Sequence, residues 1–219
     1  MGRRVKVNAL VLNSVNYSES SKMLTALSDR FGKISISAKG ANKPNSPFLA
    51  CSQVFCYSSM ELSEGRNGVY TLCECELINS FYAIREDIDI VFEAYDLAKA
   101  VLTVCQEENA DEELMRLALN TLYYLCVLSE RNKTSGEGEK AREEFFNRVI
   151  FVKCVFYIRL ASDQGFFDYP VSFNNPDTEK AVEHITSCDF KELFAFSLKS
   201  DAFKELSLIA DKARTNVLE

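Results

Sequence analysis

Three lysines near the front of this 219-residue chain have the type and spacing to bind phosphate. Lys33 and Lys39 bracket a segment in which apolar and polar residues alternate, the period-two pattern of a half-buried strand. Both lysines are therefore expected on one open face, and Lys43 adds a charge in the turn-rich loop that follows. The alternating apolar residues are Ile34, Ile36 and Ala38.

Further cations and a tyrosine are candidates for the same surface, which would suit a polyanion. Phosphate contacts give an affinity that decreases with salt and carry little sequence information. An exposed tyrosine can also stack on a base, and we expect Tyr57 to be exposed as well, with Phe31, Phe48 and Tyr70 in the core. The alternative interpretation is an ordinary solvated strand face. The candidate nucleic-acid-binding residues are Arg3, Arg4, Lys6, Tyr17, Lys22, Lys33, Lys39 and Lys43.

The cysteines and the single histidine do not form a catalytic or metal-binding pattern. Cys73 and Cys75 are two residues apart on a predicted strand, so we expect both thiols on one face, but two ligands alone make a poor zinc site. His184 lacks a histidine or cysteine partner. The sequence also lacks a Walker loop, a dinucleotide-binding glycine pattern and a serine elbow. We expect no enzymatic activity, no cofactor and no metal.

The net charge of −7 is unevenly distributed along the chain. Residues 1–80 contain nine Lys and Arg against six Asp and Glu, whereas residues 81–219 contain 16 against 26. A polyanion would therefore be expected to bind residues 1–80. The acidic remainder would face solvent or a protein partner.

The lysine-bearing strand is one of about five strands expected in the first 80 residues. The others are expected at about residues 5–15, around residues 23–27, and at about residues 54–62 and 69–81, with turn signals between them. This number and length fit a small Greek-key barrel such as the OB-fold, whose open face binds single strands. An SH3-like barrel or a small sandwich would give a similar pattern. We assign residues 1–82 to an OB-fold nucleic-acid-binding domain.

Residues 83–219 have the three-or-four spacing of amphipathic helices. We expect an all-α domain for partner interaction, which makes the chain an α+β protein. An exposed linker is expected at 130–139 and an irregular stretch at 162–177. The expected helices are at about 85–108, 111–128, from about 140 with an apolar middle at 145–160, and at about 177–187, 190–199 and 201–214.

The composition favours a cytoplasmic protein with reduced cysteines. No window approaches the roughly 18 to 20 apolar residues of a membrane span, and the N-terminal segment lacks a hydrophobic signal core. The eight cysteines are scattered among apolar residues without any Cys-x-x-Cys pair. We therefore expect no membrane association.

The order and spacing of several short motifs resemble the bacterial RecO family of recombination mediators. The match is dense over about residues 5–90 and only architectural afterwards. The matching motifs are Tyr17 to Lys22, Leu24-Thr25, Phe31-Gly32-Lys33-Ile34, Ala38-Lys39-Gly40-Ala41 with Lys43 and Ser46, Tyr70-Thr71-Leu72, Glu76-Leu77-Ile78, Ser80-Phe81 and Arg85-Glu86-Asp87.

This resemblance implies an N-terminal OB-fold, a helical C-terminal domain and an ATP-independent role in DNA repair. Such proteins bind and anneal single-stranded DNA, and with RecR they assist RecA loading onto DNA coated by the single-strand binding protein. Many members carry a zinc ribbon, but residues 162–177 contain no cysteine, so zinc is not expected.

The family also implies an apolar groove for the acidic C-terminal tail of the single-strand binding protein. Phe145, Val149 or Tyr157 would line this groove. The alternative function is a protein-interaction adaptor whose barrel binds protein with negligible DNA affinity. The candidate partner-binding cations at the rim are Lys140, Arg142, Arg148 and Lys153.

Overall fold

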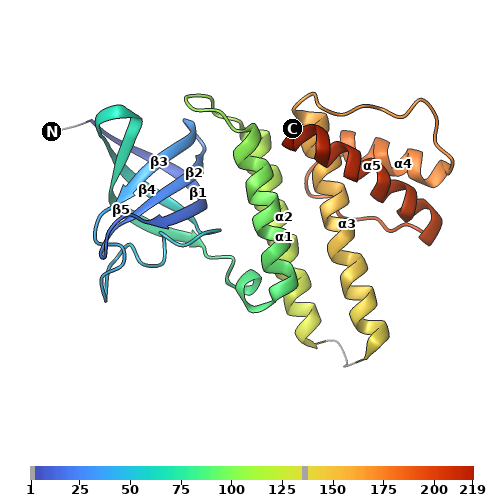
Figure 1. The fold of residues 1–219 in the computed structure, drawn as a ribbon, viewed down its shortest axis with the longest axis horizontal. Helices are drawn as coiled ribbons and strands as arrows, with labels where there is room; N and C mark the ends of the chain where they lie inside the picture. The colour runs from blue at the N-terminus through green and yellow to red at the C-terminus, as the bar shows by residue number, and fades with distance from the viewer. Residues whose placement is uncertain (1–2, 135–137) are drawn as a thin grey trace. The chain divides into compact units, whose positions relative to one another are not determined.

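The computed structural model describes residues 3–134 and 138–219, which divide into two compact units. The first unit is a β-barrel and the second is helical (Figure 1). The barrel unit contains the described residues up to Tyr82 together with Cys105–Met115, and the helical unit contains Ala83–Val104 and Arg116–Glu219. The sequence had led us to place Cys105–Met115 in the helical domain, whereas its contacts assign it to the barrel unit.

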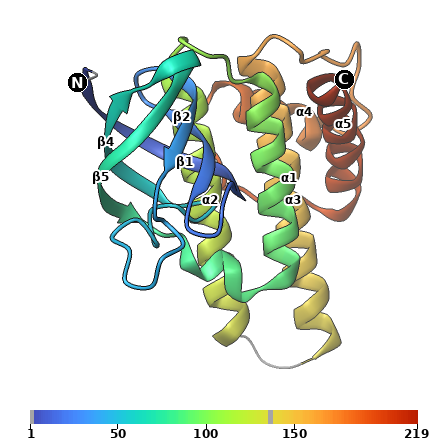
Figure 2. The same ribbon diagram turned by 60° about the vertical axis from the view of Figure 1, so that its left-hand side comes forward.

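The barrel consists of five strands, β1 (Arg4–Asn16), β2 (Lys22–Ser28), β3 (Gly32–Ala38), β4 (Tyr57–Glu64) and β5 (Val69–Asn79). Their order around the closed barrel is β1-β2-β3-β5-β4, with β4 paired to β1. Figure 2 labels four of these strands, β1, β2, β4 and β5. β3 and β5 are parallel, and all other pairs are antiparallel. This five-stranded Greek-key barrel confirms the predicted OB-type fold and excludes a sandwich.

Apolar residues at alternate positions of the strands fill the interior of the barrel. In β3, Ile34, Ile36 and Ala38 are buried whereas Lys33 and the two serines are half-exposed, as predicted. Each large aliphatic side chain buried in this way contributes roughly 1.5 to 3 kcal/mol. The remaining fully enclosed core residues are Val7, Ala9, Val11, Leu24, Ala26, Ala41, Met60, Leu62 and Leu72.

The connection between β3 and β4, residues 39–56, consists of turns rather than strand. We expected β4 to begin at Val54, but it begins at Tyr57. Phe55, which the predicted strand would have included, has a positive φ of 69° and is buried in the connection before β4. Its amide donates to the carbonyl of Val11 at 2.7 Å, which fixes the connection against β1.

Five α-helices follow the barrel: α1 (Ile88–Val104), α2 (Glu112–Thr134), α3 (Glu139–Asp163), α4 (Pro176–Ser187) and α5 (Ser200–Leu218). The predicted helix at 190–199 was wrong, because residues 190–194 form turns and residues 195–199 have no regular secondary structure. The predicted linker at 130–139 was also partly wrong, since α2 continues to Thr134. Ser135 and Gly136 of that linker lie outside the described residues.

Helix α3 is the central helix of the second unit, as its apolar middle predicted. From Val149 to Ala161 every side chain except Ile150 and Lys153 is buried. α3 packs against α1, α4 and α5. Across the described residues, none of the helices has the length and apolar character needed to cross a bilayer.

Candidate nucleic-acid interface

Four of the candidate residues meet at one end of the barrel, which we call the lysine end: Tyr17, Lys22, Lys39 and Lys43. Tyr17 follows β1, Lys22 begins β2, Lys39 follows β3, and Lys43 lies in the next turn. Lys22 pairs across the ladder with Ala38, the residue directly before Lys39. The end of β1, the start of β2 and the end of β3 therefore bring these side chains to one edge.

Hydrogen bonds join the two turns that carry the lysine end. The Asn42 amide donates to the Ser20 carbonyl at 3.1 Å, and the Asn42 side chain donates to Asn16 Oδ1 at 2.9 Å. The Gly40 amide donates to Ser21 Oγ at 3.3 Å. The turns after β1 and after β3 are thus held together, so less ordering is required when an anion binds.

The lysine end is open to solvent and mainly positive. Tyr17 is 74% exposed, which leaves its ring free to stack on a base. Lys39 and Lys43 are exposed and Lys22 is half-exposed. Glu19, exposed in the same turn, supplies one opposing charge.

Small hydroxylated side chains continue from the lysine end along the outside of the barrel. Thr25 on β2 pairs with Ser35 on β3, and Ser37 pairs with Thr71 on β5. All four are half-exposed. Hydroxyl groups can donate to phosphate oxygens without adding bulk, so this face allows a strand to approach the barrel wall.

Lys33 lies at the opposite end of β3 and does not join the lysine end. Its amide donates to the Gln106 carbonyl at 2.8 Å, and Gly32 forms a β-bridge with Glu107. The neighbouring positions Glu107 and Glu108 are acidic and exposed. Lys33 is therefore in an acidic environment, unlike Lys39, which follows the other end of β3.

Arg3, Arg4 and Lys6 lie at the start of β1, on the side of the barrel formed with β4. Arg4 Nη1 donates to Glu61 Oε1 at 2.8 Å, and this bond raises the pKa of Arg4. Lys6 is directly opposite Glu61 in the ladder. Arg4 and Lys6 thus face a carboxylate, and none of the three cations extends the lysine end.

The predicted core aromatics are in or against the core. Phe31, Phe48 and Tyr70 pack against the barrel interior, and the rings of Phe31 and Tyr70 stack with their centroids 5.9 Å apart. Tyr57, which we expected to be exposed, is only half-exposed, and burial raises its pKa. Tyr17 is therefore the better candidate for stacking.

Two of the four candidate partner-binding cations line a pocket of about 340 Å³ in the helical unit, here called the α3 pocket. Lys140 and Arg148 lie on α3, together with the acidic Glu143 and Glu144. Arg142 does not line it. The aromatic part of the lining was not predicted, because residues 190–199, which include Phe196, were expected to form a helix. The aromatic lining residues are Phe151, Phe196 and Phe203.

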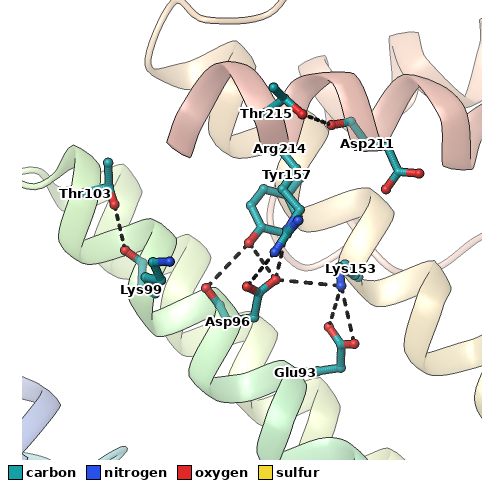
Figure 3. A network of polar contacts seen from close by, with 9 residues as sticks. All are labelled: Glu93, Asp96, Lys99, Thr103, Lys153, Tyr157, Asp211, Arg214 and Thr215. Carbon is teal, nitrogen blue, oxygen red and sulfur yellow. Dashed lines mark hydrogen bonds and ion pairs between the residues drawn. The ribbon is translucent and has the colours of Figure 1, made fainter. Parts of the chain in front are cut away.

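Lys153, the remaining candidate, belongs to a polar network between α1, α3 and α5 (Figure 3). Its Nζ lies 3.2 Å from Glu93 Oε2 and 3.7 Å from Asp96 Oδ2. Burial opposes ionisation of Asp96, but hydrogen bonds from Arg214 and Tyr157 outweigh it and lower the pKa of Asp96. Lys153 therefore stabilises helix packing.

Two predicted lining residues of the groove are also core residues. Val149 is buried, and Tyr157 is fully buried with its hydroxyl donating to Asp96 Oδ2 at 2.9 Å. Phe145 instead lines a neighbouring pocket between α2 and α3, which it shares with Arg148. Of the three predicted lining residues, Phe145 therefore lies at a pocket, whereas Val149 and Tyr157 are buried.

The thiols of Cys73 and Cys75 do not share a face, contrary to our expectation. A β-bulge leaves Cys73 without a partner on β4, so Cys75 packs against the core while Cys73 lies near Arg4. His184 Nε2 is 3.0 Å from the Glu192 carbonyl. Within residues 3–134 and 138–219, no three His, Cys, Asp or Glu residues are grouped so that they could hold a metal ion.

Comparison with known proteins finds relatives that are named DNA repair proteins. The family model described as "Recombination protein O N terminal" matches residues 1–81. DNA repair protein RecO of Acetivibrio thermocellus is 28% identical over 98% of this chain and 92% of its own length. RecO proteins of Clostridium novyi and Caldicellulosiruptor saccharolyticus are 31% and 33% identical, each over 55% of this chain. These matches span 46% and 49% of the two relatives. The N-terminal 81 residues therefore match the family model of the RecO N-terminal domain, and the chain as a whole is similar to proteins named DNA repair protein RecO.

Proposed function

We propose that this protein is a non-enzymatic recombination mediator that binds single-stranded DNA at the lysine end of the barrel and promotes strand annealing. With RecR, it would assist RecA loading onto DNA coated by the single-strand binding protein. The observation that carries this proposal is the convergence of Lys22, Lys39, Lys43 and the exposed Tyr17 at one edge.

The chemistry of this edge supports annealing without catalysis. Three ammonium groups reduce the phosphate repulsion that keeps two complementary strands apart. Tyr17 offers a stacking surface that any base can use. The half-exposed hydroxyls of Thr25, Ser35, Ser37 and Thr71 extend the path of the backbone over the barrel.

Replacing Lys22, Lys39 and Lys43 together by alanine is expected to weaken binding of a single-stranded oligonucleotide and to flatten its salt dependence. Each phosphate contact contributes about 0.7 to the slope of log affinity against log salt. The slope should therefore become shallower by about 2. Fluorescence anisotropy at a series of salt concentrations measures this slope, and annealing of complementary strands should slow in parallel.

Two matched variants make this result specific. Lys33→Ala removes a lysine from the other end of β3, and Lys204→Ala removes an exposed lysine from α5. Both should bind DNA nearly as wild type does. Negligible binding by wild type at low salt would instead favour the adaptor function, in which the barrel binds protein.

We also propose that the α3 pocket binds the acidic C-terminal tail of the single-strand binding protein. Its phenylalanines suit an apolar end group, and Lys140 and Arg148 suit carboxylates. Glu143 and Glu144 at the same pocket oppose an acidic ligand. The helical unit would thus provide the partner-binding site of the mediator.

Because the pocket is lined by both cations and carboxylates, removing one or the other should change the affinity for an acidic peptide in opposite directions. Arg148→Ala should weaken binding of a synthetic aspartate-rich peptide with a C-terminal phenylalanine by about tenfold, and Glu144→Ala should strengthen it. Arg142→Ala, on the same helix but outside the pocket, is the control. Isothermal titration measures all three, and equal effects of Arg142 and Arg148 would rule out this pocket.

A further inference from the structure

Helix α1 presents apolar side chains to solvent on the face that its packing leaves uncovered. Ile88, Phe92 and Tyr95 are 70%, 68% and 49% exposed. Their spacing of four and then three residues places them on one side of the helix. We call this row, together with the exposed Lys99 one turn further along, the α1 stripe.

The packing of α1 within the helical unit does not use the α1 stripe. The carboxylates of Glu93 and Asp96 bond to side chains of α3 and α5 (Figure 3). A row of large apolar side chains that the fold does not bury is typical of a surface that binds a protein. The buried residues of α1 lie on the side opposite the stripe and are Ile90, Ala94, Leu97, Ala98, Ala100 and Val101.

The α1 stripe has one charge at each end, and the two charges have opposite signs. Asp89 lies beside Ile88 at the start, and Lys99 is at the end; among the described residues, neither side chain forms an ion pair. They are ten residues apart, which is about 15 Å along a helix. A twofold axis at the level of Ala94 would therefore place each Asp89 level with Lys99 of a second, antiparallel copy. A parallel pair would instead bring like charges together.

We propose that two copies of this chain associate through the α1 stripe, with the two helices antiparallel about a twofold axis. Phe92 and Tyr95 lie on either side of the level of the axis, so each phenylalanine would contact the tyrosine of the other copy. Ile88 would pack against the methylene groups of Lys99, whose ammonium group reaches Asp89. One helix pair buries less than the roughly 1,200 Å² of stable complexes, so the dimer is reversible, with a Kd of roughly 10 to 100 μM.

Such a dimer would carry two barrels and therefore two lysine ends, one for each strand of an annealing pair. Joining two binding sites raises the effective concentration of one captured strand near the other. This consequence rests on the proposed binding of DNA, whereas the dimer itself does not.

Sedimentation equilibrium of the full chain, in reducing buffer and without DNA, tests the dimer at concentrations from about 2 to 200 μM. The weight-average mass should rise from the 24.8 kDa of one chain toward twice that value. It should not exceed this limit, because a twofold contact is closed. A constant mass of one chain, or growth beyond a dimer, would overturn the proposal.

Phe92→Glu should weaken the self-association by at least about tenfold, because a carboxylate replaces the ring next to the axis. Tyr123→Glu is the matched control, since Tyr123 is a 61% exposed aromatic residue on α2, outside the stripe. Both side chains are exposed, so the core is unchanged, and circular dichroism checks the fold. Equal weakening by the two substitutions would show that the contact does not use the α1 stripe.

A charge exchange tests the antiparallel orientation. Asp89→Lys alone and Lys99→Glu alone each place like charges at both ends of the contact, so each should weaken self-association by about tenfold. An equal mixture of the two variants should associate about as strongly as wild type, because both ends again join opposite charges. Failure of the mixture to recover would refute the antiparallel pairing. The mediator function is tested separately by DNA binding, so either proposal can fail without the other.

Discussion

Replacing Arg159 by alanine is expected to lower the free energy of unfolding of the helical unit by roughly 3 to 5 kcal/mol. Arg159 is only 8% exposed, and its Nη1 donates to the carbonyls of Ile185 and Cys188 at 3.1 and 2.9 Å. Its Nε donates to the carboxylate of Asp163 at 2.9 Å, and its guanidinium lies 4.6 Å from the ring centre of Phe190. Alanine would remove the donor for the two carbonyls at the end of α4 and for the Asp163 carboxylate at the end of α3.

Urea unfolding followed by circular dichroism measures this loss. Arg142→Ala is the matched control, because it is the same substitution at an exposed position of the same helix and should change stability by less than about 0.5 kcal/mol. Arg159→Lys should recover little, since an ammonium cannot reproduce the planar array of donors. Equal stabilities of the Arg159 and Arg142 variants would show that these hydrogen bonds do not hold α4.

Replacing Gly32 by alanine is expected to destabilise the barrel unit by about 3 kcal/mol or more. Gly32 has a φ of +64°, which costs an L-residue about 1 to 2 kcal/mol. A Cβ there would also lie 2.2 Å from the Asn109 carbonyl oxygen and 2.3 Å from that of Gln106. Because both are backbone atoms, the loop between α1 and α2 must move, and the bond from the Lys33 amide to Gln106 is lost.

Gly68→Ala separates the cost of a positive φ from the cost of a clash with the neighbouring backbone. Gly68 has a φ of +72° in the turn between β4 and β5, but a Cβ there would contact nothing within 4 Å. This variant should therefore lose only about 1 to 2 kcal/mol. Hydrogen exchange should show an unprotected Lys33 amide in the Gly32 variant alone, and equal losses in both variants would contradict a close approach of the loop.

The alternation of apolar and polar residues was sufficient to predict the barrel. It did not predict which side chains come together at the lysine end. Alternation predicted Lys33 and Lys39 on one face of a strand, whereas Lys39 lies in the turn that follows β3. Lys33 and Lys39 are also six residues apart, and six residues of an extended strand span about 20 Å. The grouping of Lys39 with Lys22 and Tyr17 depends on the pairing of β1, β2 and β3 and on the turns that join them.

Local irregularities account for most other differences between prediction and structure. The bulge at Cys73 shifts the alternation of inward and outward side chains along β5 by one residue. The residue types in β5 do not predict this bulge. The segment 190–199 has a helical composition, yet the Asp189 side chain bonds the amide of Lys191 and stabilises a turn instead. Lys153 was predicted to lie at the rim of a groove, but its ammonium group pairs with Glu93 and Asp96 from another helix.

The assignment of Cys105–Met115 to the barrel unit has a consequence for synthesis on the ribosome. The chain up to Tyr82 supplies all five strands, but the segment that bonds to the start of β3 ends 33 residues later, at Met115. The whole of α1 is translated before that segment emerges. The barrel unit therefore reaches its final set of contacts only after the first helix of the other unit has been made.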